Sequence, residues 1–100
     1  MRRYRLSGRA KRDLDQIWSG LAQKATVDVA DKVIDEITSR FPLLAMMPES
    51  GRVRADIAFG VRSFPVDQYV IYYQKPSRGL LVVSRVLHGK RDQIDIYRKG

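Results

Sequence analysis

The chain has 100 residues, 44% of them hydrophobic, which is enough for one domain around one core. It has no cysteine and a single histidine, so disulfides, thiolate metal sites and multi-histidine zinc sites are excluded, and we expect neither a metal nor a cofactor. No apolar run approaches the roughly 20 residues of a membrane span, so we expect a cytoplasmic protein with no membrane partner. The net charge of +8 predicts an anionic partner, either nucleic acid or an acidic protein segment.

The chain begins with a candidate strand at Arg3–Leu6, and Ser7 after it offers its hydroxyl as a helix N-cap. Over residues 9–24, apolar side chains recur at spacings of three and four, which predicts an amphipathic helix. Trp18 belongs to this apolar stripe and is expected in the core; the alternative is partial exposure at a groove that binds a partner. The charged residues of the helix, Asp13 among them, are expected to lie mostly away from the stripe and in solvent.

A second helix is expected to begin after Thr26, whose hydroxyl suits an N-cap. Pro42 should end or kink this helix because proline lacks the N–H donor and restricts the residue before it. The apolar pattern resumes over residues 43–47, which allows one further turn. Only a few residues separate the two helices, so they should form an antiparallel αα-hairpin. Pro48–Gly51 then has the composition of a loop.

The second half of the chain predicts strands. Val61–Phe64 is the first of them, and Pro65 is expected to interrupt it; residues 52–59 remain unassigned. Gln68–Lys75 and Leu80–Leu87 are rich in β-branched and aromatic residues and should pair as a β-hairpin around a turn at Pro76–Gly79.

Strict alternation along the last strand would put Leu81, Val83, Arg85 and Leu87 on one face of the sheet. Both faces of the hairpin are mostly apolar, so both require cover. The spacing of Ile94 and Tyr97 allows a short C-terminal helix over residues 90–98.

These elements predict a single α+β domain over residues 1–100, with the order β-α-α-β-β-β and a possible short C-terminal helix. The αα-hairpin should cover one face of an antiparallel sheet. Two helices cannot cover both faces, so the second face must be covered by the tail, be covered by a partner, or remain an exposed apolar patch.

Nucleotide-binding, zinc-protease, nucleophile-elbow and calcium-binding motifs are all missing from the sequence. A set of basic residues on or beside the sheet remains. In a functional interpretation, they stabilise charge on a phosphate while His88 or Tyr97 donates a proton. In a structural interpretation, Arg85 pairs with Asp67 or Asp92. The basic residues are Arg62, Arg85, His88, Lys90 and Arg91.

Four blocks of sequence resemble, in order, the ParE-type toxins of the ParE/RelE superfamily. The first, Ala10–Trp18, resembles the start A-x-x-D-L-x-x-I-W of these toxins. The others are Leu44 with Pro48–Arg52, Val61–Phe64 with Tyr69–Tyr73, and Val86–Gly89 with Arg91-Asp92. The resemblance implies a toxin of a bacterial type II toxin–antitoxin operon.

In this family the cognate antitoxin has a DNA-binding half and an acidic, disordered half that wraps the toxin. The resemblance therefore implies that operator DNA is bound only indirectly, through the antitoxin. We expect the acidic half to lie partly as a helix against the αα-hairpin and partly along a sheet edge. The residues assigned to this contact are Trp18, Leu21, Arg62 and Arg85.

ParE-type members inhibit DNA gyrase without catalysis, whereas RelE-type members of the same fold are ribosome-dependent mRNA endonucleases. The Asp-Leu-x-x-Ile-Trp helix and the Val-Leu-His ending favour a gyrase inhibitor with no catalytic residues. The mRNA endonuclease is the alternative, and its catalytic residues would be Arg62, Arg85, His88 and Tyr97.

The gyrase-facing surface is expected on the C-terminal segment, where apolar anchors are ringed by cations. An equally open interpretation makes this tail a cap for the second sheet face. The residues assigned to gyrase binding are His88, Lys90, Arg91, Ile94, Tyr97 and Arg98.

Overall fold

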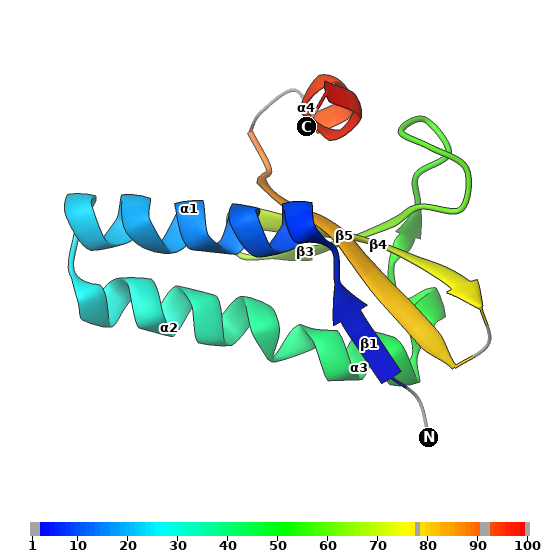
Figure 1. Ribbon diagram of the computed structural model, residues 1–100, viewed down its shortest axis with the longest axis horizontal. Helices are drawn as coiled ribbons and strands as arrows, with labels where there is room; N and C mark the ends of the chain where they lie inside the picture. Colours follow the sequence, from blue (N-terminus) through cyan, green and yellow to red (C-terminus); the bar gives the residue numbers. More distant parts are fainter. Residues whose placement is uncertain (1–2, 78, 91–92, 100) are drawn as a thin grey trace.

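A five-stranded sheet forms the centre of the molecule, with helices on both of its faces (Figure 1). The computed structural model describes residues 3–77, 79–90 and 93–99. The strands lie in the spatial order β1-β5-β4-β3-β2. In chain order the elements are β1 (Arg3–Leu6), α1 (Gly8–Lys24), α2 (Val27–Thr38), α3 (Arg40–Met46), the 3₁₀ turn η1 (Pro48–Ser50), β2 (Arg52–Val53), β3 (Arg62–Val66), β4 (Tyr69–Ser77), β5 (Leu80–His88) and α4 (Gln93–Lys99).

The predicted helix starts are confirmed. The Ser7 hydroxyl accepts the N–H of Ala10 at 3.0 Å, and the Thr26 hydroxyl accepts the N–H of Val29 at 3.1 Å. Each bond satisfies an N–H that a helix start leaves without an intrahelical partner. α1 and α2 then run antiparallel, and together with α3 they cover one face of the sheet (Figure 1).

The break expected near Pro42 is also confirmed. α2 ends at Thr38, and Pro42 lies in the first turn of α3, where its missing N–H costs no helical hydrogen bond. α3 presents Phe41 and Leu44 to the core, and each is only 1% exposed.

The expectation of a purely antiparallel sheet is wrong for one pair of strands. β1 pairs in parallel with β5, with Arg3 opposite Leu80 and Leu6 opposite Val83. Parallel neighbours need a long connection. The chain between β1 and β5 is long enough, since it contains α1, α2 and α3 as well as β2, β3 and β4. The other pairs, β2 with β3, β3 with β4 and β4 with β5, are antiparallel.

The predicted alternation along β5 is wrong because the strand contains an irregularity at Ser84. Tyr72 pairs with Arg85 while Tyr73 pairs with Val83, so Ser84 is the extra residue of a β-bulge. Val83 therefore packs in the helix-side core, whereas Leu87 packs on the opposite face with Tyr72. The bulge reverses which face the last residues of β5 occupy.

The β-hairpin itself is confirmed, with two differences in its boundaries. β4 continues through Ser77, so Pro76 belongs to the strand and the turn is shorter than predicted. Pro65 also lies within a strand instead of interrupting it, since β3 runs from Arg62 to Val66. β2 extends only along the first two residues of β3, so no strand on that side requires the N–H that proline lacks.

The second face of the sheet is covered by α4 and by the loop between β2 and β3. Ile57 from the loop and Tyr72 and Leu87 from the strands are buried there. Ile94 and Tyr97 of α4 pack against this cluster. Of the three possibilities for this face, the structure shows cover by the tail, and the loop adds to it.

We expect Gly51→Ala to lower the free energy of unfolding by about 1–3 kcal/mol, the range for overpacking a well-filled core. Gly51 is buried, and its N–H donates to the Tyr73 hydroxyl at 2.7 Å, while that hydroxyl donates to the Pro48 carbonyl at 2.7 Å. A Cβ at Gly51 would overlap the Tyr73 ring and displace it from both hydrogen bonds.

Urea unfolding followed by circular dichroism measures this effect. Gly20→Ala is the control, since a Cβ at this position in α1 meets nothing within 4 Å. The control should be neutral or stabilising by up to about 1 kcal/mol. Equal changes in the two variants would contradict the steric explanation for Gly51.

Candidate binding groove

A groove of about 540 Å³ lies between α1, the C-terminal end of β5 and α4. It forms where β1 stops pairing with β5 at Val83, so that α1 crosses the strand edge beyond this point. The Ser7 hydroxyl donates to the Ser84 carbonyl at 2.9 Å and joins the start of α1 to this edge. The lining residues are Asp13, Gln16, Ile17, Gly20, Leu21, Lys24, Tyr69, Arg85, Val86, Leu87, His88, Lys90 and Ile96.

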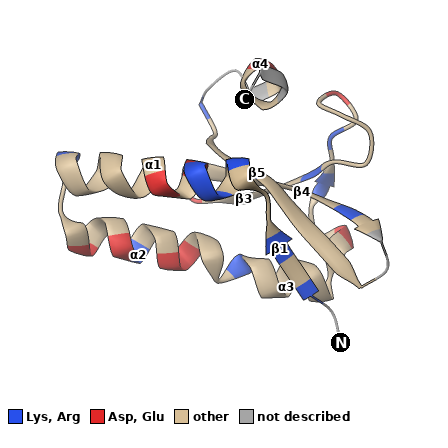
Figure 2. Cartoon of the chain, viewed as in Figure 1, with Lys and Arg blue, Asp and Glu red and all other residues tan. Residues whose placement is uncertain are grey.

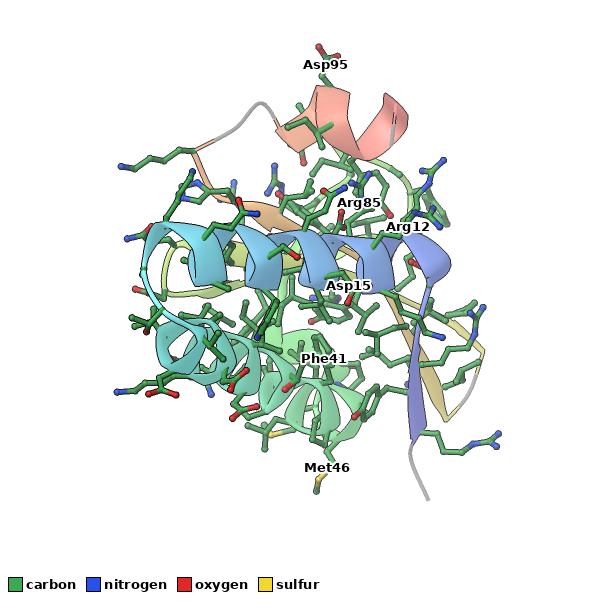
Figure 3. All side chains as sticks on the ribbon, turned by 60° about the vertical axis from the view of Figure 1, so that its left-hand side comes forward. Arg12, Asp15, Phe41, Met46, Arg85 and Asp95 are labelled. Carbon is green, nitrogen blue, oxygen red and sulfur yellow. The ribbon has the colours of Figure 1, made fainter. Side chains whose placement is uncertain are left out.

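Asp13 and Arg85 form an ion pair at the base of this groove, and each residue is only 8% exposed. Arg85 Nε donates to Asp13 Oδ2 at 2.8 Å, and Arg85 Nη2 donates to Oδ1 at 2.9 Å. Asp13 Oδ2 also accepts the N–H of Val86 at 3.0 Å, and Arg85 Nη1 donates to the Ile96 carbonyl at 3.1 Å. The pair therefore connects α1, β5 and α4, and Figure 3 shows Arg85 between the two helices.

The hydrogen bonds that Arg85 donates to Asp13 raise the pKa of Arg85 above its usual value, against the opposing effect of burial. The expected solvated position of Asp13 is wrong, because the helix face on which it lies meets the open edge of β5. Asp67 is not the partner of Arg85; it lies in the turn between β3 and β4, with φ at 55°. Asp92, the other expected partner, lies outside the described residues.

The lining of the groove mixes apolar, polar and basic side chains. Ile17, Leu21 and Leu87 contribute apolar surface, while Lys24 and Lys90 are exposed. Asp13 is the only acid among the described lining residues, and Arg85 neutralises it. The groove therefore favours an acidic ligand with apolar side chains.

The α2 side of the helical layer, away from the groove, carries a net negative charge. α2 carries four acids and one lysine, and Figure 2 shows this acidic helix beside the basic start of α1 and the basic strand β1. An acidic ligand would therefore be repelled from α2 and attracted to the groove.

His88 and Lys90, both assigned to gyrase binding, line the groove together. The Lys90 N–H donates to His88 Nδ1 at 3.2 Å, and the His88 ring contacts the Tyr69 ring edge to face with centroids 5.4 Å apart. Leu21 and Arg85, assigned to the antitoxin, line the same groove. Residues assigned to two different partners therefore line one groove.

Two further residues assigned to the antitoxin lie outside the groove lining. Trp18 is 36% exposed, so its expected place in the core is wrong. Its indole Nε1 donates to Asp31 Oδ1 at 2.8 Å, and this exposed hydrogen bond connects α1 to α2 near the turn between them. Arg62 donates to the Gly51 carbonyl at 2.7 Å.

The tail residues assigned to gyrase binding are turned mainly toward the sheet. Ile94 and Tyr97 are half-buried against the second-face cluster. The Tyr97 ring lies edge to face with Tyr72 at a centroid distance of 5.6 Å, and its hydroxyl donates to Ser84 Oγ at 2.9 Å. Arg91 and the side chain of Arg98 lie outside the described part of the chain.

The structure separates Arg62 from the other residues of the nuclease alternative, while Arg85 and His88 line one groove and Tyr97 is bonded to Ser84 beside Arg85. Arg62 lies opposite Tyr73, whereas His88 lies opposite Tyr69, which is about 13 Å away along β4 at 3.3 Å per residue. Arg85 is bound to Asp13. The described residues also hold no group of three or more metal-ligating side chains, and no described helix is long and apolar enough to cross a membrane.

Comparison with known proteins identifies the family. Residues 4–93 match the family described as the ParE toxin of the type II toxin–antitoxin system parDE. The chain belongs to the ParE toxin family. This confirms the resemblance found in the four sequence blocks.

Two curated ParE relatives align over almost their full lengths. Toxin ParE1 of Mycobacterium tuberculosis is 30% identical over 90 residues, which cover 90% of this chain and 92% of the relative. Toxin ParE1 of Caulobacter vibrioides is 33% identical over 88 residues, which cover 88% and 90%. A chain in a solved structure of the chromosomal ParDE system from P. aeruginosa has a TM-score of 0.75 at 18% identity, over 88% of this chain and 95% of that one, and so shares the fold.

The sequence does not assign Asp13, Ile17, Lys24 or Leu87 to a site, although all four line the groove. Asp13 has the largest structural role of the four, since it holds Arg85. A signal was present, since Asp13 follows Ala10 by three positions and precedes Ile17 by four, which puts it on the edge of the apolar stripe. A carboxylate at that spacing predicts either a destabilised helix face or a buried cationic partner. Only the fold identifies the partner as Arg85.

Proposed function

We propose that this chain is the toxin of a type II toxin–antitoxin pair and acts in the cytoplasm as a non-enzymatic inhibitor of DNA gyrase. Membership of the ParE family supports the toxin assignment, and the resemblance to ParE-type members implies the target. The observation that carries the proposal is the groove, whose apolar side chains and exposed lysines suit the binding of a protein segment.

The separation of Arg62 from His88, and the engagement of Arg85 by Asp13, support inhibition by binding. General acid–base catalysis requires the participating groups to meet around one reacting bond. Arg62 and His88 lie at different ends of the β3–β4–β5 sheet. Arg85 has its guanidinium directed to Asp13 and to the Ile96 carbonyl, which leaves it poorly placed to bind a phosphate.

The cognate antitoxin is the partner we propose for the groove. An acidic segment that folds on binding would place apolar side chains against Ile17, Leu21 and Leu87, and its carboxylates beside Lys24 and Lys90. Operator DNA would then be contacted by the antitoxin and not by this chain.

Overlap of the two surfaces suggests how neutralisation works. Leu21 and Arg85 were assigned to the antitoxin and His88 and Lys90 to gyrase, and all four line one groove. An antitoxin segment in the groove would cover His88 and Lys90. Occlusion of the target-binding surface would therefore be sufficient to neutralise the toxin, without a conformational change.

The test measures gyrase supercoiling and cell-free translation in parallel. We expect the purified chain to inhibit supercoiling and to leave mRNA intact on translating ribosomes, and the antitoxin to restore supercoiling. Ribosome-dependent mRNA cleavage by the chain, with supercoiling unaffected, would replace the proposed function with that of an endonuclease.

The groove is tested in the same experiment with the double variant Lys24→Glu/Lys90→Glu. We expect its affinity for the antitoxin to fall at least tenfold, with a weaker dependence on salt, because two favourable charge contacts become repulsive. Lys32→Glu on α2 is the matched control, since it reverses one exposed lysine away from the groove. Unchanged antitoxin affinity in the double variant would exclude the groove as the antitoxin site.

A further inference from the structure

Phe59 is the most exposed large apolar side chain in the described part of the chain, at 99% exposed. It lies in the loop between β2 and β3, the green loop that projects from the sheet in Figure 1. The next most exposed large apolar residue is Met46, at 67%. Isolated exposed apolar residues are common in proteins, so the structure of the loop that carries Phe59 decides how its exposure should be interpreted.

The loop is closed and internally bonded. The Arg54 N–H donates to the Val61 carbonyl at 2.8 Å, which joins the two ends of the loop. Inside it, the Ile57 N–H donates to the Arg54 carbonyl at 3.0 Å, and the Val61 N–H donates to the Ala58 carbonyl at 3.3 Å. These bonds are typical of a turn that holds one conformation.

Side chains hold the loop on the sheet as well. Arg54 donates to both carboxylate oxygens of Asp56 at 3.0 Å, and its guanidinium lies 5.8 Å from the centre of the Tyr72 ring. These hydrogen bonds raise the pKa of Arg54 and lower that of Asp56. Ile57 is buried at 1% exposure in the second-face cluster, two residues before Phe59.

Gly60 directs the chain back toward β3 immediately after Phe59. Its φ is +80°, a conformation that side chains other than glycine rarely adopt. The loop therefore buries one apolar residue as its base and holds a second, Phe59, at its tip. This arrangement fixes the backbone that carries the aromatic ring before any partner binds, which reduces the entropy that the loop loses on binding.

We propose that Phe59 is an anchor that inserts into a preformed apolar pocket on the folded target protein of the toxin, and that the antitoxin does not use it. This inference rests on the proposed function, since it assumes that the toxin acts by binding a target protein. A projecting ring requires a concave pocket. A folded protein offers such a pocket, whereas an acidic segment that is disordered before binding does not.

The charge of the loop around Phe59 indicates which residues should surround the pocket on the partner protein. Residues 52–62 contain three arginines and one aspartate, a local charge of +2. Arg52 is exposed, while Arg54 and Asp56 neutralise each other. The partner surface should therefore be an apolar pocket with acidic residues at its edge.

The test compares Phe59→Ala with Phe59→Trp and with Val53→Ala, a control at another apolar side chain that is 59% exposed. We expect Phe59→Ala to raise the concentration needed for half-inhibition of gyrase supercoiling at least tenfold. Its melting temperature and its affinity for the antitoxin should equal those of the wild type. Phe59→Trp should retain most of the inhibition, and Val53→Ala all of it.

Three outcomes separate this inference from the proposed function. If the wild type inhibits supercoiling and Phe59→Ala inhibits it equally, or if Phe59→Ala binds the antitoxin tenfold more weakly, the inference is overturned and the proposed function stands. If the wild type does not inhibit supercoiling, the proposed function fails. The role of Phe59 is then tested by measuring whether induced expression of each variant arrests cell growth. A folded Phe59→Ala variant that still arrests growth then overturns the inference, and one that no longer does so supports it.

Discussion

Replacing Asp13 with alanine is expected to lower the free energy of unfolding by about 3–5 kcal/mol, because removing one partner of a buried ion pair leaves the other charge uncompensated. The carboxylate accepts two hydrogen bonds from Arg85 and one from the N–H of Val86. Its loss would leave the largely buried Arg85 cation without a counter-ion, bonded only to the Ile96 carbonyl, and the N–H of Val86 without its acceptor.

Urea unfolding measures this change, and Asp15→Ala is the matched control. Asp15 is an exposed carboxylate on the same helix, two residues along, as Figure 3 shows. We expect the control to change the free energy of unfolding by less than about 0.5 kcal/mol. Similar losses in the two variants would mean that the ion pair contributes little.

The double variant Asp13→Leu/Arg85→Met removes both charges of the buried pair, whereas Asp13→Ala leaves one charge without its partner. We expect it to be more stable than Asp13→Ala alone, because apolar groups of similar volume remove both the charges and their desolvation cost. The N–H of Val86 would still lack its acceptor, so recovery should be incomplete. A double variant that is less stable than Asp13→Ala would contradict this account.

Deleting residues 93–100 is expected to lower the free energy of unfolding by about 3 kcal/mol or more, from the loss of several partly buried apolar side chains. Of the two interpretations that the sequence leaves open, a tail that only binds the target could be removed with little effect on stability, whereas a tail that caps the sheet could not. Ile94, Ile96 and Tyr97 pack against the second-face cluster, so the deletion would expose Tyr72 and Leu87 to water.

Calorimetric or optical melting measures the effect, with Tyr97→Phe as the control. The control keeps the ring against Tyr72 and removes only the hydroxyl, which donates to Ser84. We expect it to cost about 0.5–1.5 kcal/mol, the net value of a typical hydrogen bond. If the truncated chain has the same melting temperature as the wild type, the tail does not stabilise the fold. That result would favour the other interpretation, in which the tail is a target-binding segment.

Prediction from the sequence was most successful where the physical cause is local. Ser7 and Thr26 cap helices because their hydroxyls reach the N–H groups three residues ahead, which depends on no distant part of the chain. Pro42 separates two helices for an equally local reason. The β-branched and aromatic residues of the β4–β5 hairpin pair as expected, and the ordered sequence blocks identified the ParE family.

The tertiary structure decided what depends on residues far apart in the chain. The bulge at Ser84 arises from the pairing of β4 with β5, and it directs Arg85 and Leu87 to a face that alternation along one strand does not predict. The parallel pairing of β1 with β5 leaves the strand edge beyond Val83 open to α1. That edge creates the groove and gives Asp13 its partner 72 residues later in the chain.

The sequence by itself determined the helices, the hairpin, the basic charge and the family of this protein, because capping, periodicity and turn chemistry act between neighbouring residues. Only the tertiary structure showed that Asp13 is buried, that Trp18 is exposed, and that Leu21, Arg85, His88 and Lys90 share one groove. The physical reason is that burial and ion pairing depend on which surfaces meet. These contacts are set by strand order and register, which no short stretch of sequence contains.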